Sequence, residues 1–187
     1  LKDRLIKRKL EYAPVPLKSV QMRANSTRRE FFSKSNKMPT VWRNLFFPTE
    51  ILNALGVRML TLETYAALFA RNSKRTKKAL DVAAYKGFAA ETCSFLRVLE
   101  GSDLPRPDFG VSTSQPCQQG ERIFQDLARQ YDFTDRFYSL HTPVSMNDDN
   151  AVETIAEGLE TAVRKMEKAL GLKMDPGKLS EACDLSN

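Results

Sequence analysis

The 187 residues are 42% hydrophobic and 28% charged, which suits a globular chain of one domain, or of one domain and the beginning of another. No apolar stretch approaches the ~20 residues of a membrane-spanning helix, and the first residues lack the apolar centre of a signal peptide, so we expect a cytoplasmic protein without a membrane span. Three cysteines in such a chain argue against a disulfide framework.

The net charge of +6 is unevenly distributed along the chain. Residues 1–43 contain 12 Lys and Arg against 3 Asp and Glu, whereas the remaining residues contain 17 against 20. We therefore expect a basic, partly helical N-terminal arm over 1–38 in front of a nearly neutral domain. Such an arm could contact an anionic partner, but an ordinary solvated surface explains it better. No RNA-binding or helix-turn-helix pattern supports nucleic acid as a partner.

The first readable elements are a strand, a short helix and a second strand. Residues 40–45 are rich in β-forming side chains, and Pro48 and Thr49 then open a helix in which Glu50 is favourable near the N-terminus. Gly56 is expected to end this helix, and 57–62 predicts the second strand.

The rest of the chain continues this alternation. Residues 64–100 predict three helical segments, a third strand follows at about 108–112, and a helix begins after Cys117. A fourth strand within 136–144 precedes a long helix that Gly171 ends, and a last helix begins after it. Helical spacing places three apolar residues on the buried faces of their helices: Leu68, Phe95 and Val152.

This order predicts an α/β fold with a small open, mostly parallel four-stranded sheet flanked by helices, of the Rossmann or flavodoxin-like kind. We assign the sheet domain to 39–172, and 173–187 to the start of a helix that leads to a second domain. Ligands of such sheets bind at the carboxyl ends of the strands. At that edge we expect the segment after the first strand, the turn STSQPC and His141.

Cys93 and Cys117 each precede an apolar helical segment. The N-terminal end of a helix favours a thiolate, and soft thiolates select zinc, Cu(I) or iron–sulfur clusters. However, the separation of 24 residues matches no short zinc motif, and two unrelated buried cysteines explain the spacing equally well. Cys183 lies in a helical segment with Leu179, Ala182 and Leu185, and we expect it in an apolar core.

Three stretches resemble, in their order, the 2-hydroxyacyl-CoA dehydratase family, which also includes benzoyl-CoA reductase subunits and double-cubane cluster proteins: VWRNLFFPTEILNALGVRMLTLE, ETCSFLRVL and DFGVSTSQPCQQGERIFQDL. The resemblance covers about residues 40–185. It implies that Cys93 and Cys117 are two ligands of an iron–sulfur cluster, [4Fe-4S] being favoured, whose third cysteine lies in a second domain outside this chain. The chain would then be the N-terminal part of a larger two-domain protein.

The resemblance also implies a lyase reaction and its partners. A separate ATP-hydrolysing iron–sulfur activator supplies a low-potential electron, the acyl-CoA thioester forms a ketyl radical, and the 2-hydroxyacyl-CoA loses water. The expected partners are therefore an acyl-CoA substrate, this activator and a second homologous subunit.

Individual site residues follow from the same resemblance. Glu50 matches the Pro-x-Glu position of the family and is a candidate for contacting substrate, although a stabilising charge at a helix start explains it as well. His141 is a candidate for proton transfer, with a structural histidine as the alternative. Gln115, Gln118 and Gln119 could donate hydrogen bonds to cluster sulfurs.

Other functions fit the same residues. A benzoyl-CoA reductase-like or double-cubane ATP-dependent reductase is the alternative within the family. A non-catalytic α/β interaction or assembly module is the alternative of another class, and it predicts that both cysteines are replaceable. A zinc-binding module is disfavoured because no Cys/His pairs lie near either cysteine.

Overall fold

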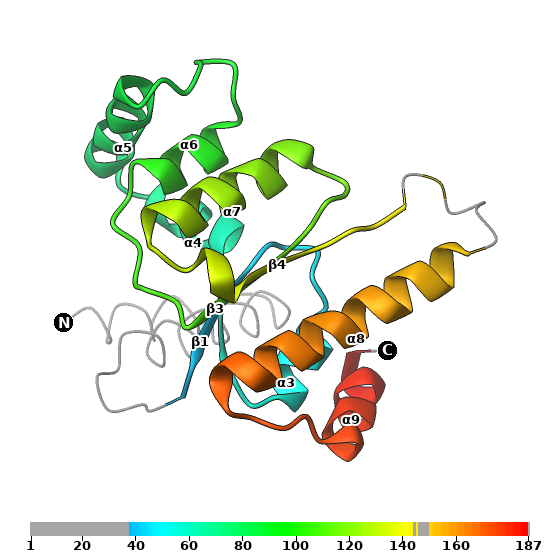
Figure 1. Ribbon diagram of the computed structural model, residues 1–187. Coiled ribbons are helices and arrows are strands. Elements are labelled where there is room, and N and C mark those ends of the chain that lie inside the picture. Colours follow the sequence, from blue (N-terminus) through cyan, green and yellow to red (C-terminus); the bar gives the residue numbers. More distant parts are fainter. Residues whose placement is uncertain (1–37, 144, 146–149, 187) are drawn as a thin grey trace, which may run out of the picture. The chain divides into compact units, whose positions relative to one another are not determined.

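The computed structural model describes residues 38–143, 145 and 150–186 (Figure 1). Apart from Met38, the predicted basic arm lies outside the described residues. None of the helices in the described part of the chain is both long and apolar enough to cross a membrane.

Four parallel strands form one sheet in the order β2–β1–β3–β4. The central strand β1 pairs through Val41 with Met59 on one side and with Phe109 on the other. The all-parallel sheet confirms the predicted α/β fold class. The strands are β1 (Thr40–Arg43), β2 (Arg58–Thr61), β3 (Phe109–Thr113) and β4 (Phe137–Leu140).

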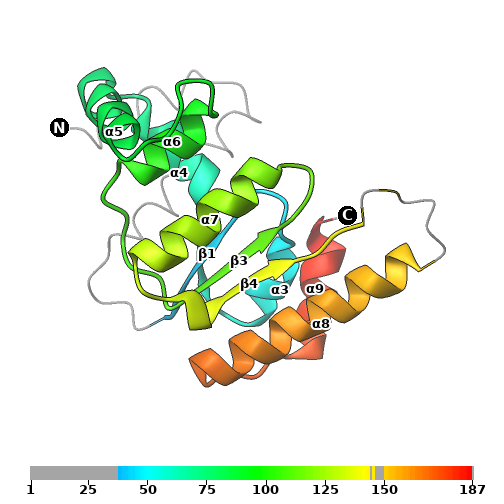
Figure 2. The ribbon, with the colours of Figure 1, turned by 45° about the horizontal axis from the view of Figure 1, so that its top comes forward.

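Helices cover both faces of the sheet (Figures 1 and 2). One face carries α4, α5, α6 and α7, and the other carries α3, α8 and α9. A short 3-10 helix, Thr134–Arg136, precedes β4. The helices are α3 (Thr49–Ala54), α4 (Leu62–Phe69), α5 (Ser73–Tyr85), α6 (Ser94–Glu100), α7 (Gln118–Gln130), α8 (Ala151–Leu170) and α9 (Pro176–Ser186).

Alternation along β1 directs successive side chains into the two cores, because neighbouring residues of a strand point to opposite faces. Val41 belongs to the core under α3 and α8, together with Leu52 and Met166. Trp42 is fully buried and meets Tyr131 and Phe133 edge-on, with ring centroids 5.1 and 5.2 Å away. A sheet buried on both faces accounts for the nearly continuous apolar character of its strands.

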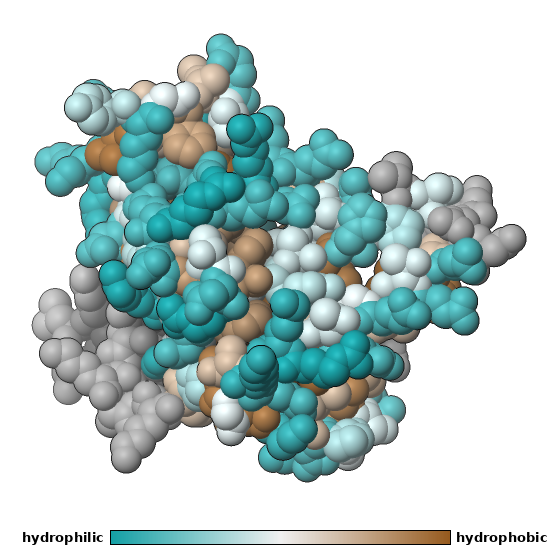
Figure 3. Space-filling model, viewed as in Figure 1, coloured by the Kyte–Doolittle hydropathy of each residue, from teal (hydrophilic) through white to brown (hydrophobic). Residues whose placement is uncertain are grey.

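Three predicted core residues are exposed instead: Leu68 of α4, Phe95 of α6 and Val152 of α8. Their helices are short or reach the sheet with only part of their length, so fewer apolar positions are covered than the spacing suggests. The face seen in Figure 3 is mostly hydrophilic, with apolar side chains in small groups.

The prediction that Cys183 lies in a core is wrong. Cys183 and Leu185 are exposed in the described structure. The partly buried positions of α9 are Leu179 and Ala182, which are three residues apart on one helical face. That face packs toward α3, and Cys183 lies beside it rather than on it.

A lysine next to a buried carboxylate joins the C-terminal ends of three helices. Lys86, which follows α5, donates hydrogen bonds to the backbone oxygen of Glu100 at 2.6 Å and to Oε1 of Gln130 at 2.8 Å. Its Nζ is 3.6 Å from the Glu100 carboxylate, whose side chain is only 3% exposed. Burial raises the pKa of Glu100, and Lys86 opposes that shift. At the end of α6, a Cβ on Gly101 would collide with the carbonyl oxygen of Ala79, so glycine permits this close packing of α6 on α5.

We expect Lys86→Met to destabilise the protein by about 1–3 kcal/mol at neutral pH, because it leaves the Glu100 carboxylate buried without a cation. The loss should shrink at acidic pH, where Glu100 takes up a proton and no longer needs one. Urea unfolding at both pH values measures the effect. Arg164→Met is the control, since it removes an exposed ion pair with Glu160 and should cost less than about 0.5 kcal/mol. Equal effects of the two substitutions would contradict the prediction.

Candidate functional site

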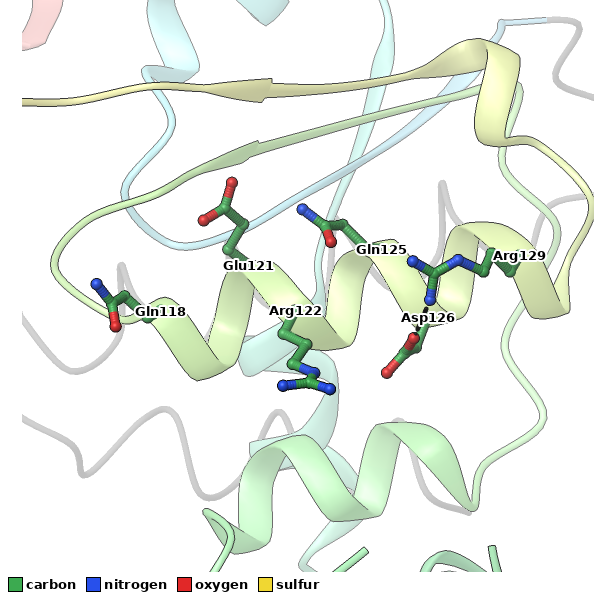
Figure 4. A pocket seen from close by; sticks show the side chains of 6 residues that line it. All are labelled: Gln118, Glu121, Arg122, Gln125, Asp126 and Arg129. Atoms are coloured by element: carbon green, nitrogen blue, oxygen red, sulfur yellow. Dashed lines mark hydrogen bonds and ion pairs between the residues drawn. The ribbon is translucent and has the colours of Figure 1, made fainter. Parts of the chain in front are cut away.

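The carboxyl edge of the sheet brings the predicted cysteines to one side of the molecule. Cys93 and Cys117 are the N-cap residues of α6 and α7. These two helices run side by side in the same direction, with their N-termini toward the edge where the strands end (Figures 1, 2 and 4). Both thiols are exposed. The predicted placement of each cysteine at a helix start is confirmed.

Backbone groups hold both cysteines in place. The Sγ of Cys117 accepts a hydrogen bond from the backbone N–H of Gly120 at 3.3 Å, and its carbonyl oxygen accepts one from Glu121 at 3.2 Å. The carbonyl oxygen of Cys93 accepts from the N–H of Arg97 at 3.0 Å. The free N–H groups and the dipole of a helix start favour negative charge, so both positions suit a thiolate ligand.

The two thiols fit a soft metal group only as a partial ligand set. Exposed cysteines at two adjacent helix starts have the softness and access that an iron–sulfur cluster needs. Within the described residues, no group of three or more Cys, His, Asp or Glu side chains could hold a metal ion. Further ligands would therefore have to come from outside this part of the chain.

The other predicted residues lie near the same edge. His141 follows β4 and is exposed, and Gln118 is exposed at the start of α7. Gln115 is half-buried in the turn after β3.

Glu50 lies in the first turn of α3. A hydrogen bond from its own backbone lowers the pKa of Glu50, with contributions from Ser186, Thr49 and Arg43. The carboxylate is therefore ionised at neutral pH and suited to accepting hydrogen bonds rather than donating a proton.

Two opposite charges at this edge, the buried Arg43 and the half-buried Glu63, were not predicted from the sequence. Arg43, at the end of β1, is 9% exposed, and its guanidinium donates hydrogen bonds to the carbonyl oxygens of Asn44, Leu45 and Phe47. Glu63 lies in the first turn of α4, which directly follows the neighbouring strand β2. The available sequence signal was a charged residue at the end of β1 and another just after β2. Sequence spacing alone does not indicate how far these two side chains are buried.

Both members of this pair retain unused hydrogen-bonding capacity. Nε of Arg43 and Oε2 of Glu63 are buried without a hydrogen-bond partner within the described structure. Burial lowers the pKa of Arg43, which nearby Glu63 and Glu50 oppose. Burial raises the pKa of Glu63, opposed by backbone hydrogen bonds and by Arg43. A carboxyl group with a raised pKa at the ligand-binding edge of a sheet is a candidate for proton transfer.

A surface hollow of about 340 Å³ lies along α7 and is a poorer candidate site (Figure 4). All of its lining residues come from this one helix, and three of their charged side chains already have partners. Asp126 pairs with Arg129, and Glu121 accepts a hydrogen bond from Ser139 at 2.5 Å. The hollow is therefore a solvated helix face. Its lining residues are Gln118, Glu121, Arg122, Gln125, Asp126 and Arg129.

Comparison with known proteins gives matches over most of the chain. A family model described as 2-hydroxyglutaryl-CoA dehydratase, D-component, matches residues 44–187. The (R)-2-hydroxyisocaproyl-CoA dehydratase alpha subunit of Clostridioides difficile is 24% identical over 168 residues, which cover 83% of this chain and 40% of that protein. The (R)-phenyllactyl-CoA dehydratase alpha subunit of Clostridium sporogenes is 25% identical over 158 residues, covering 78% and 38%. The chain thus spans about two fifths of the length of these relatives.

We expect Glu63→Gln to weaken the pH dependence of stability. Because the pKa of Glu63 is raised in the folded state, the folded protein binds this proton more tightly than the unfolded chain. The free energy of unfolding should therefore fall as the pH rises from the ordinary value of 4.5 through the folded pKa, and glutamine should remove that part of the decline. Urea unfolding at a series of pH values tests this, with the exposed Glu160→Gln as control. An unchanged decline in Glu63→Gln would refute the burial of an ionisable carboxyl here.

Proposed function

Because the chain belongs to the 2-hydroxyglutaryl-CoA dehydratase D-component family, we propose that it is part of a dehydratase that removes water from a 2-hydroxyacyl-CoA. The family match confirms the membership predicted from three sequence stretches. The observation that carries the proposal is the placement of two exposed cysteines at adjacent helix starts on the ligand-binding edge of a parallel sheet. The matched relatives are named as alpha subunits of dehydratases, which favours a dehydratase over the reductases of the same family.

Cys93 and Cys117 would hold an iron–sulfur cluster, most simply [4Fe-4S], with a further cysteine from outside the described residues. Such a cluster supplies electrons one at a time at low potential. The helix starts around the two thiols place N–H groups and positive dipole ends beside the ligand sulfurs, which stabilises negative charge there. Gln118 and Gln119, in the first turn of α7, could donate further hydrogen bonds to these sulfurs.

The elimination also requires proton transfer, for which this chain offers two kinds of carboxyl group. Loss of water removes the hydroxyl from C2 and a proton from C3 of the acyl chain, and the hydroxyl leaves as water once it gains a proton. Glu63 has a raised pKa and an oxygen with no hydrogen-bond partner in the described part of the chain, so it suits a group that carries a proton between these positions. Glu50, held ionised, would accept hydrogen bonds from substrate, and His141 is a further candidate for proton transfer.

The surroundings of the cysteines suit a covered site. Leu45 and Phe46, after β1, are 53% and 51% exposed, and Phe95, two residues after Cys93, is 47% exposed. Apolar residues in such a position favour burial against another protein surface, which would also exclude water and oxygen from the cluster. We assign this cover to a second domain or a homologous subunit. The electron donor would be an ATP-hydrolysing iron–sulfur activator, and the substrate an acyl-CoA.

Anaerobic expression of the full-length protein tests the cluster. We expect the wild type to contain iron and sulfide and to show broad visible absorption, and Cys93→Ser or Cys117→Ser to lose most of both. Cys183→Ser is the matched control, because Cys183 is exposed on α9 and should be dispensable.

A folded wild type that stays free of iron after reconstitution would end the dehydratase proposal. The non-catalytic interaction module would then take its place. If iron persists in both cysteine variants, residues other than Cys93 and Cys117 bind the cluster.

A further inference from the structure

We propose that Thr142 is a positioning residue for Cys117, which it holds through the turn that connects β3 to α7. The role of Cys117 as a metal ligand rests on the proposed function, whereas the contacts that position it do not. Thr142 comes from the loop after β4, 25 residues away along the chain from the cysteine.

Two hydroxyl groups join the loop after β4 to the turn after β3. The backbone N–H of Gln115 donates to Oγ1 of Thr142 at 3.1 Å, and the N–H of Thr142 donates to Oγ of Ser114 at 3.0 Å. The two hydroxyl oxygens are themselves 3.3 Å apart. A backbone hydrogen bond from Ser114 to Leu140 at 2.9 Å continues the ladder between β3 and β4 into this contact.

The same turn is held from the opposite side by the loop after β1. Oγ1 of Thr113 donates to the carbonyl oxygen of Gln115 at 2.6 Å, and Nδ2 of Asn44 donates to Thr113 Oγ1 at 2.8 Å. The side chain of Asn44 also accepts from the N–H of Phe47 at 3.1 Å. Asn44 and Thr113 are buried, so this side of the turn is anchored in the interior.

Threonine hydroxyls therefore bind both backbone polar groups of Gln115, that of Thr142 from the loop after β4 and that of Thr113 from the end of β3 itself. Cys117 follows two residues later, and α7 begins immediately after it. The thiol of Cys117 thus lies between Gln115, whose backbone is hydrogen-bonded on both sides, and the start of α7. Together these two features restrict the position of Sγ. In the described structure, Gln115 takes part in these hydrogen bonds through its backbone N–H and carbonyl groups.

Of the two threonine hydroxyls that bind the backbone of Gln115, the hydroxyl of Thr142 can be removed without disturbing the sheet. Thr142 is half-buried and lies beyond the last residue of β4, whereas Thr113 is a buried residue of β3. Valine has the shape of threonine without its hydroxyl, so Thr142→Val deletes the contacts of that hydroxyl to Gln115 and Ser114 and keeps the bulk of the side chain. Thr142→Ser retains the hydroxyl.

The hydrogen bond from Gly120 to Sγ of Cys117 gives a direct readout of the thiol position. In the full-length protein freed of metal, we expect the Gly120 amide to exchange its hydrogen roughly fivefold faster in Thr142→Val, the effect of losing one hydrogen bond that restrains the turn. Thr142→Ser should exchange like the wild type. The Arg75 amide, which Asn72 caps in the same way at the start of α5, is the internal control and should not change.

A titration with cadmium, monitored by the absorption of the cadmium–thiolate bonds, then tests whether the position of the Cys117 thiol affects metal binding. We expect roughly tenfold weaker binding in Thr142→Val, in the range seen when a group that orients a metal ligand is lost. Thr154→Val, on the exposed side of α8, controls for the substitution itself.

An unchanged Gly120 exchange in folded Thr142→Val would overturn the proposal, as would faster exchange with undiminished cadmium affinity. If Thr142→Val also accelerates Arg75, the variant is unfolding generally, and Ser114→Ala decides instead, because it removes the other hydroxyl that joins Thr142 to this turn. Absence of iron in the wild type would count against the cluster but would leave the exchange result standing.

Discussion

Parallel pairing of four short strands is the constraint on which the rest of the molecule depends. It sends every strand end to one edge of the sheet, and it requires helices on both faces because the return connections must cross over them. The start of α4 therefore follows directly after β2, and the starts of α3 and α7 follow β1 and β3 after short loops. Unpaired backbone N–H groups and positive dipole ends collect at the same edge, and this makes it suitable for thiolates, carboxylates and anionic ligands.

Polar groups at this edge are buried to an unusual extent for strand-end loops. Arg43 and Asn44 are both less than a tenth exposed; Arg43 binds carbonyl oxygens of the loop that follows it, and Asn44 binds the hydroxyl of Thr113 in β3. Burial of charge costs free energy unless partners compensate it, and among the described residues Arg43 and Glu63 each keep one buried atom without a partner. Incomplete compensation of this kind is common at functional sites, where a ligand or moving proton can use the unpaired groups.

The elements and the two cysteines were predictable because their signals are local. The backbone preferences of single residues mark the start of α3 at Pro48 and the end of α8 at Gly171, which has a φ of 66°. The helical period of the apolar residues marks α7. The placement of Cys93 and Cys117 followed from the same reasoning. Cys183 was predicted to be buried but is exposed. The prediction failed because the burial of a helix face depends on how much of the helix contacts the core.

The sequence by itself determined the succession of strands and helices, the parallel sheet and the family, and it predicted that Cys93 and Cys117 each begin a helix. Only the tertiary structure decided that Arg43 is buried with its charge close enough to the half-buried Glu63 to affect its pKa, and that Thr142 contacts the turn before Cys117. The physical reason is that these contacts join loops from different strands. Their residues are far apart in the chain and follow no period, so only the packed sheet makes them neighbours.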